Sequence, residues 1–181
     1  GFTYTVLLPL LLFLPVFISG SVAVDAVTEE VERGTLELLR VTPASFVAIV
    51  DGKATAAILL APLQAALWIA LLSLNGIAVR HPLALLAVVL ALGTAFVWLG
   101  IGLSVLVPSR QRAQLLYSTA ILVAFGGATA LPEQPTTTVA RLAVGSPGDL
   151  TFLAVGAYAV VALALLVGVR AVARRVDPAA L

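Results

Sequence analysis

Long apolar stretches alternate with short polar connections along most of this 181-residue chain. A helix that crosses the roughly 30 Å hydrocarbon core of a bilayer needs about 20 mainly apolar residues. Five stretches fit such helices, and they lack the period-2 alternation that is typical of β-strands. The pattern predicts an all-α membrane protein, a polytopic bundle of five transmembrane helices at residues 2–24, 54–74, 83–107, 115–131 and 150–169.

Helix-breaking residues modify two of these predicted spans. Pro9 and Pro15 lie in the first span and should kink it, because proline removes a backbone donor and clashes with the preceding turn. The fourth span is the shortest and contains Gly126 and Gly127, so we expect it to unwind or end early.

The connection at residues 132–149 is rich in Pro, Gly and Thr. It is too short to hold a hydrophobic core of its own. The composition predicts a short external loop or re-entrant turn here. Because this connection is too short to be a separate domain, we expect residues 1–181 to form a single membrane domain.

Composition excludes several other classes of protein. Apolar residues make up 61% of the chain and charged residues 10%, whereas soluble domains carry about 25% charged residues. The absence of cysteine excludes disulfides, thiolate metal sites and a cysteine nucleophile. A net charge of +1 gives no reason to expect nucleic acid as a partner.

The basic residues predict the orientation of the chain, because cytoplasmic loops of membrane proteins are enriched in Lys and Arg. Only Arg80 and Arg141 fall on one side of the predicted spans. The other side collects Arg33, Arg40, Lys53, Arg110, Arg112, Arg170, Arg174 and Arg175. We therefore expect a cell-membrane protein with residues 28–42 and Leu181 in the cytoplasm and Gly1 outside.

The amino end carries a further expectation. The chain begins at Gly1 and contains no methionine. An external amino end without a signal sequence predicts that an odd number of spans, most simply one, precedes Gly1 in the parent protein.

A charged segment, residues 28–42, lies between the first two predicted spans and holds four of the nine acidic residues. Its charged residues fall at helical spacing, with a predicted bend at Gly34-Thr35 and an end at Thr42-Pro43. Periodicity alone leaves two interpretations open: a solvated connector, or an amphipathic helix that docks a soluble partner.

The residues of this segment resemble a known signature. Glu30–Leu39, followed by Thr42-Pro43 and Gly52-Lys53, is similar to the motif of type-2 ABC export permeases, which reads Glu-Lys-Glu-Arg-Gly-Thr-Leu-Glu-x-Leu-Leu. Val31 replaces the lysine that is common there, and Ser146-Pro147 stands in place of a frequent Asn-Pro.

The resemblance implies a six-helix permease half, of which this chain holds the last five spans. It implies that residues 28–42 are the coupling segment, which fits a separate ATP-binding subunit that carries ATP and Mg²⁺. It also implies a second permease half, identical or different, and no enzymatic activity in this chain. The residues expected to contact the ATP-binding subunit are Glu30, Glu32, Arg33, Gly34, Thr35, Leu36, Glu37, Leu38 and Leu39.

Other functions fit the sequence less well. A membrane scaffold that docks some other soluble partner through residues 28–42 remains an alternative. An intramembrane protease would need more histidines than His81, and Gly52-Lys53 lacks the preceding glycine of a phosphate-binding loop. No predicted span has a charge near its centre, which disfavours proton relays and favours a path for amphiphilic or hydrophobic cargo.

Overall fold

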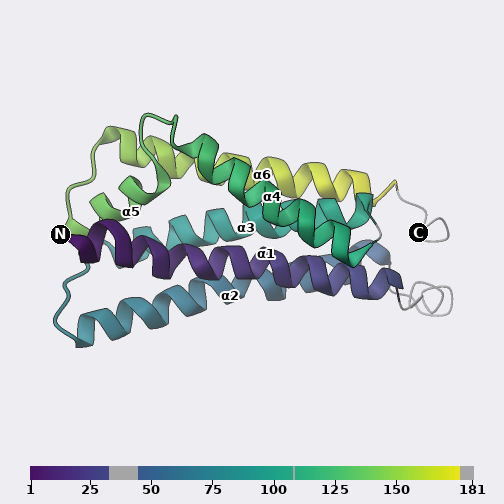
Figure 1. Cartoon of the computed structure of the whole chain (residues 1–181), viewed down its shortest axis with the longest axis horizontal. Coiled ribbons are helices and arrows are strands. Elements are labelled where there is room, and N and C mark those ends of the chain that lie inside the picture. Colours follow the sequence, from purple (N-terminus) through teal and green to yellow (C-terminus); the bar gives the residue numbers. More distant parts are fainter. Residues whose placement is uncertain (33–44, 108, 176–181) are drawn as a thin grey trace.

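The computed structural model describes residues 1–32, 45–107 and 109–175, and every regular element within them is helical. Helices α1, α3 and α6 run in one direction along the bundle, while α2 and α4 run in the other (Figure 1). In chain order the elements are the π-turn η1 (Thr3–Leu7), α1 (Leu8–Glu32), α2 (Phe46–Leu74), α3 (Pro82–Leu106), α4 (Arg110–Ala128), α5 (Pro135–Val144) and α6 (Asp149–Ala173).

Helix α3 is the centre of the bundle. It packs against α1, α2, α4, α5 and α6, and its most extensive contact is with α1. Its sequence is apolar on every side, which is typical of a helix that is surrounded by others. The remaining helices are therefore arranged around the pair α1–α3.

Two glycines allow α1 and α3 to approach closely. A Cβ atom added at Gly100 of α3 would lie 2.8 Å from the carbonyl oxygen of Gly20 and 2.9 Å from Val24 Cγ2, both on α1. A Cβ atom added at Gly20 would overlap the ring of Tyr117 from α4, which is fully buried and donates a hydrogen bond of 2.9 Å to the Phe17 carbonyl. Helices α1, α3 and α4 therefore meet at a point where α1 and α3 each carry a glycine, which leaves room for the ring of Tyr117.

The first two helices extend beyond their predicted spans. The prediction ended the first span at residue 24, but α1 continues to Glu32, with Val27 and Thr28 buried and the Thr28 hydroxyl bonded to the Val24 carbonyl at 2.8 Å. The second helix begins at Phe46 and not at residue 54. Its start is fixed by Ser45, whose hydroxyl accepts a hydrogen bond from the Ala48 N–H at 3.2 Å, as expected of an N-cap. Hydropathy marked only the apolar part of each helix.

The prolines of the first span act locally. A wide π-turn, η1, precedes Pro9 and relieves the crowding that a proline ring imposes on the turn before it. Pro15 lies inside α1, which remains helical on both sides of it.

Among the described residues, four helices are long and apolar enough to cross a membrane: Thr3–Glu32, Phe46–Leu74, Pro82–Leu106 and Asp149–Ala173. Helix α4, which contains most of the predicted span 115–131, is not among them, because polar residues fill its first turns. It ends at Ala128, soon after the Gly126-Gly127 pair. Its 19 residues nevertheless rise about 28 Å along α1 and α3. Five spans thus remain a prediction.

The segment predicted as a loop, residues 132–149, contains the short helix α5. Pro135 is placed at its start, and Gly145 ends it with a φ of 80°, the left-handed conformation that glycine adopts most easily. Val139, Leu142 and Ala143 are buried in the main hydrophobic cluster. The segment therefore has no core of its own but joins the core of the bundle.

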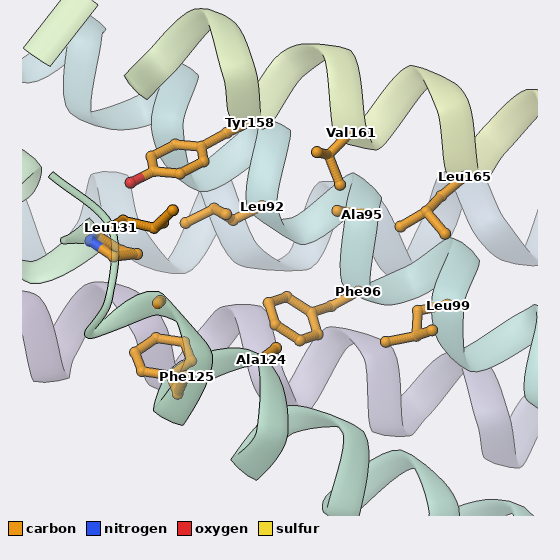
Figure 2. Close-up of a pocket in the computed structure, with 12 residues that line it drawn as sticks. Leu92, Ala95, Phe96, Leu99, Ala124, Phe125, Leu131, Tyr158, Val161 and Leu165 are labelled. Atoms are coloured by element: carbon orange, nitrogen blue, oxygen red, sulfur yellow. The ribbon is translucent and has the colours of Figure 1, made fainter. Parts of the chain in front are cut away.

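An apolar cavity of about 310 Å³ lies between α4 and α6, and residues of α3 form a third wall (Figure 2). Phe96 of α3, Phe125 of α4 and Val161 and Leu165 of α6 point into it (Figure 2). We call this cavity the α4–α6 groove.

The contact at Gly100 generates a prediction about stability. Gly100→Ala should destabilise the bundle by about 1–3 kcal/mol, because the backbone of Gly20 cannot move aside cheaply. Gly156→Ala on α6, where nothing lies within 4 Å of the added Cβ, should be neutral or stabilise by up to about 1 kcal/mol. Unfolding of the purified protein in mixed micelles measures both. Equal stability of the two variants would contradict the close contact.

Candidate functional site

The charged end of the bundle is where α1 ends, α2 and α4 begin, and α6 ends (Figure 1). Residues 33–44, which include most of the predicted coupling segment, lie outside the described residues. The described side chains of this end show how the base of that segment is attached to the bundle.

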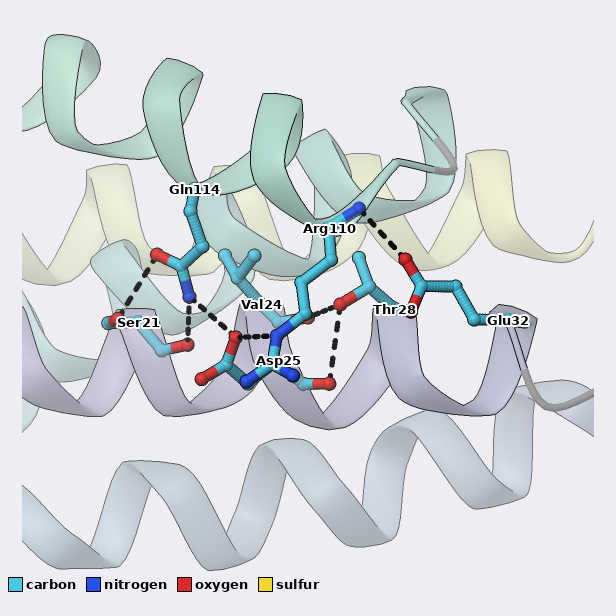
Figure 3. Close-up of polar contacts among 7 residues, drawn as sticks. All are labelled: Ser21, Val24, Asp25, Thr28, Glu32, Arg110 and Gln114. Atoms are coloured by element: carbon cyan, nitrogen blue, oxygen red, sulfur yellow. Dashed lines mark hydrogen bonds and ion pairs between the residues drawn. The ribbon is translucent and has the colours of Figure 1, made fainter.

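Asp25 of α1 is the centre of a polar cluster with α4 (Figure 3). Its Oδ1 atom accepts hydrogen bonds from Arg110 Nε at 2.8 Å and from Gln114 Nε2 at 2.9 Å. Gln114 also donates to the Ser21 carbonyl at 2.9 Å and accepts from the Ser21 hydroxyl at 3.1 Å. We refer to Ser21, Asp25, Arg110 and Gln114 as the α1–α4 clasp.

Glu32 adds a second attachment to α4. Its Oε1 accepts a hydrogen bond of 3.2 Å from the backbone N–H of Arg110, the first residue of the helix (Figure 3). Ser109, at the N-cap position, makes no side-chain hydrogen bond to the helix. The carboxylate of Glu32, from another helix, instead accepts from the first N–H group of α4. A negative charge at a helix N-terminus is also favoured by the helix dipole.

Two ion pairs join the remaining helices at this end. Glu30 of α1 and Lys53 of α2 are 2.8 Å apart, and Asp51 of α2 and Arg170 of α6 are 2.6 Å apart. All four side chains are partly exposed, with relative exposures between 28% and 37%. The contacts therefore link α1 to α2, α1 to α4, and α2 to α6.

The electrostatics of this end suit attachment between helices. The hydrogen bond from Arg110 to Asp25 and the charge of that carboxylate raise the pKa of the guanidinium. Partly exposed ion pairs contribute only about 0–1 kcal/mol each, so they can exchange partners when helices move. The described residues contain no group of acidic, histidine or cysteine side chains that could hold a metal ion.

Of the predicted coupling residues, the structure describes Glu30 and Glu32. Both contact other helices of the same chain, and neither lies in a separate short helix, because α1 is continuous to Glu32. The other predicted contacts and the predicted bend lie outside the described residues: Arg33, Gly34, Thr35, Leu36, Glu37, Leu38 and Leu39.

The clasp was not predicted from the sequence. The sequence did carry a signal for it, because Ser21, Asp25 and Glu32 follow one another at spacings of four and seven, which place them on one face of a helix. Arg110 and Gln114 are likewise four residues apart. A polar face on each of two apolar helices indicates that the two faces pair.

The four long apolar helices are those of a multi-pass membrane protein, and the charged residues gather at one end of its bundle. The family model described as ABC-2 family transporter protein matches residues 1–147. The chain belongs to this family, which supports the role of a transport permease. No curated protein and no solved structure matches the chain.

The clasp generates a second prediction. Gln114→Leu removes three hydrogen bonds between α1 and α4 and should destabilise the protein by about 1–2 kcal/mol. Gln111→Leu is the matched control, because Gln111 is exposed on the same helix. Thermal unfolding in detergent compares the two variants. A Gln114→Leu protein as stable as the control would show that the clasp contributes nothing.

Proposed function

We propose that this chain is the membrane-spanning subunit of an ATP-driven exporter and forms half of its translocation path. A separate ATP-binding subunit, which carries ATP and Mg²⁺, docks on residues 28–42, so the chain itself is no enzyme. Membership of the ABC-2 transporter family supports the transport role. The observation that carries the coupling proposal is the attachment of Glu30 and Glu32, at the base of that segment, to α2 and α4.

Force from the partner would reach the bundle through helices that are already rigid. The first five residues of the segment, 28–32, belong to α1, and α2 begins at Phe46, shortly after the segment ends. A displacement of the segment therefore moves the ends of two long helices. The clasp and Glu32 pass the displacement on to α4.

Helix α4 then connects the charged end to the α4–α6 groove. Its first turn holds Arg110, and its last turns place Ala124, Phe125 and Ala128 in the wall of the groove. A tilt of α4 driven from the charged end would open or close this groove. A second permease half, identical or different, completes the path across the membrane.

The orientation prediction follows from the positions of the basic residues. Because residues 1–181 contain no cysteine, a single cysteine introduced among them is the only reactive thiol of this part of the protein. In intact cells, Arg112→Cys and Arg175→Cys, at the charged end, should resist a membrane-impermeant maleimide. Asn75→Cys and Ser146→Cys, exposed at the opposite end, should react. The reverse pattern would place residues 28–42 outside the cell and end the coupling proposal.

The coupling prediction measures docking by co-purification and transmission by ATP hydrolysis. Glu32→Lys/Glu37→Lys should reduce co-purification of the ATP-binding subunit about tenfold or more, since like charges across an interface are strongly unfavourable. Gln114→Leu should keep that subunit bound but lower its permease-stimulated ATP hydrolysis, because the clasp is broken. Gln111→Leu should change neither quantity.

Two outcomes would contradict this scheme. If the double charge reversal leaves co-purification and stimulated hydrolysis unchanged, residues 28–42 do not couple the chain to an ATPase. If Gln114→Leu and Gln111→Leu behave alike, force does not pass through the clasp. A partner that co-purifies without ATPase activity would favour the scaffold function.

A further inference from the structure

We propose that the α4–α6 groove binds a cationic amphiphile, with the apolar chain in the groove and a primary ammonium group at Glu133. Binding at this site involves no side chain of the charged end and requires no ATP-binding subunit.

The groove has the size and lining of a small-molecule site. Its volume of about 310 Å³ lies at the lower end of the range that is usual for ligand pockets, about 300–1,000 Å³. Its walls are apolar side chains from α3, α4 and α6 (Figure 2). Val161, in the α6 wall, is 53% exposed, so the groove is open between α4 and α6. A molecule dissolved in the membrane can enter from that side.

A second, smaller cavity continues the groove toward the turn between α4 and α5. It has a volume of about 210 Å³ and shares Leu131 and Tyr158 with the groove. Figure 2 shows the Tyr158 hydroxyl pointing toward Leu131 at this junction. Glu133 lines the smaller cavity and brings a carboxylate to an otherwise apolar space, where Arg141 forms an ion pair with one of its oxygens.

Glu133 is buried and only half satisfied. Its residue exposure is 5%, and its Oε2 atom accepts one hydrogen bond of 3.2 Å from Arg141 Nη1. Its Oε1 atom is buried and has no hydrogen-bond partner in the described part of the chain. The Tyr158 hydroxyl lies near the Thr138 side chain but makes no hydrogen bond of ordinary geometry with it. Buried polar atoms in native proteins are nearly always paired, so Glu133 Oε1, which can only accept, indicates a donor that is supplied from outside.

Arg141 pairs with Oε2 of Glu133 and leaves Oε1 open, and this carboxylate oxygen selects the kind of donor. A carboxylate oxygen accepts most strongly from a cationic N–H group, and a primary ammonium offers three such donors. One donor can satisfy Glu133 Oε1 while another reaches the Tyr158 hydroxyl. An anionic head group is repelled by the carboxylate, and a neutral alcohol gains no charge interaction. A primary alkylammonium therefore fits both the groove and its polar end.

Binding of dodecylammonium tests this proposal, with dodecan-1-ol as a neutral ligand of equal chain length. The full-length protein is placed in phosphatidylcholine nanodiscs without its partner subunit, and binding to empty nanodiscs is subtracted. We expect saturable binding of dodecylammonium, roughly tenfold tighter than that of the alcohol. Glu133→Gln should abolish this preference while binding of the alcohol persists.

A matched pair of variants tests the groove itself. Val161→Trp should weaken both ligands roughly tenfold, because the indole ring would take up space that the apolar chain of the ligand needs. Val160→Trp, at the neighbouring position, which is 66% exposed and outside the groove, should bind like the wild type. Melting temperatures of all variants confirm that they are folded.

Three results would overturn the proposal: no saturable binding beyond empty nanodiscs, an ammonium preference that survives Glu133→Gln, or equal effects of the two tryptophans. A fourth is dissociation of a dimer by Val161→Trp with ligand binding unchanged, which would assign the groove to a second copy of the chain. None of these results affects the coupling proposal, which is measured through ATP hydrolysis.

Discussion

The close approach of α1 to α3 at Gly20 and Gly100 is the constraint on which the rest of the bundle depends. In a bilayer, lipid tails are as apolar as the helices, so helices associate through tight packing and interhelical hydrogen bonds. Two facing glycines give that packing, and the space beside Gly20 admits the ring of Tyr117. The hydroxyl of Tyr117 then bonds to the α1 backbone, which fixes α4 on the same pair. Helices α2 and α6 pack on the framework that results.

How much of the fold could be predicted depends on what sets each helix boundary. Helix α3 lies within one residue of its prediction at each end, because its apolar run and its helix coincide. Helices α1 and α2 continue into polar sequence, where a hydroxyl bond at Thr28 and the cap at Ser45 maintain them and hydropathy gives no signal. Helix α5 was missed because its Pro- and Thr-rich composition is typical of a loop. Yet Pro135 and Gly145 are recognised helix boundary signals.

The candidate site was predictable in part. Its location at one end of the bundle follows from the charged residues, and the family was identified from the motif that begins at Glu30. The partners of Glu30 and Glu32 were not predictable, because Lys53 and Arg110 come from other helices and only the packing of the bundle brings them near. Glu133 was missed for the same reason. Its burial depends on how the turn after α4 folds back, and no pattern in the sequence records that.

The unbroken length of the first helix has a geometrical consequence. The thirty residues of Thr3–Glu32 rise about 45 Å, whereas the hydrocarbon core is about 30 Å thick. With Thr3 at one boundary, the last turns form a stalk that projects on the order of 10–15 Å beyond the other. A soluble protein bound at the end of this stalk would lie clear of the lipid head groups. A small force applied at this free end would exert a large torque on the helix, because it acts far from the part of α1 that is packed in the bundle.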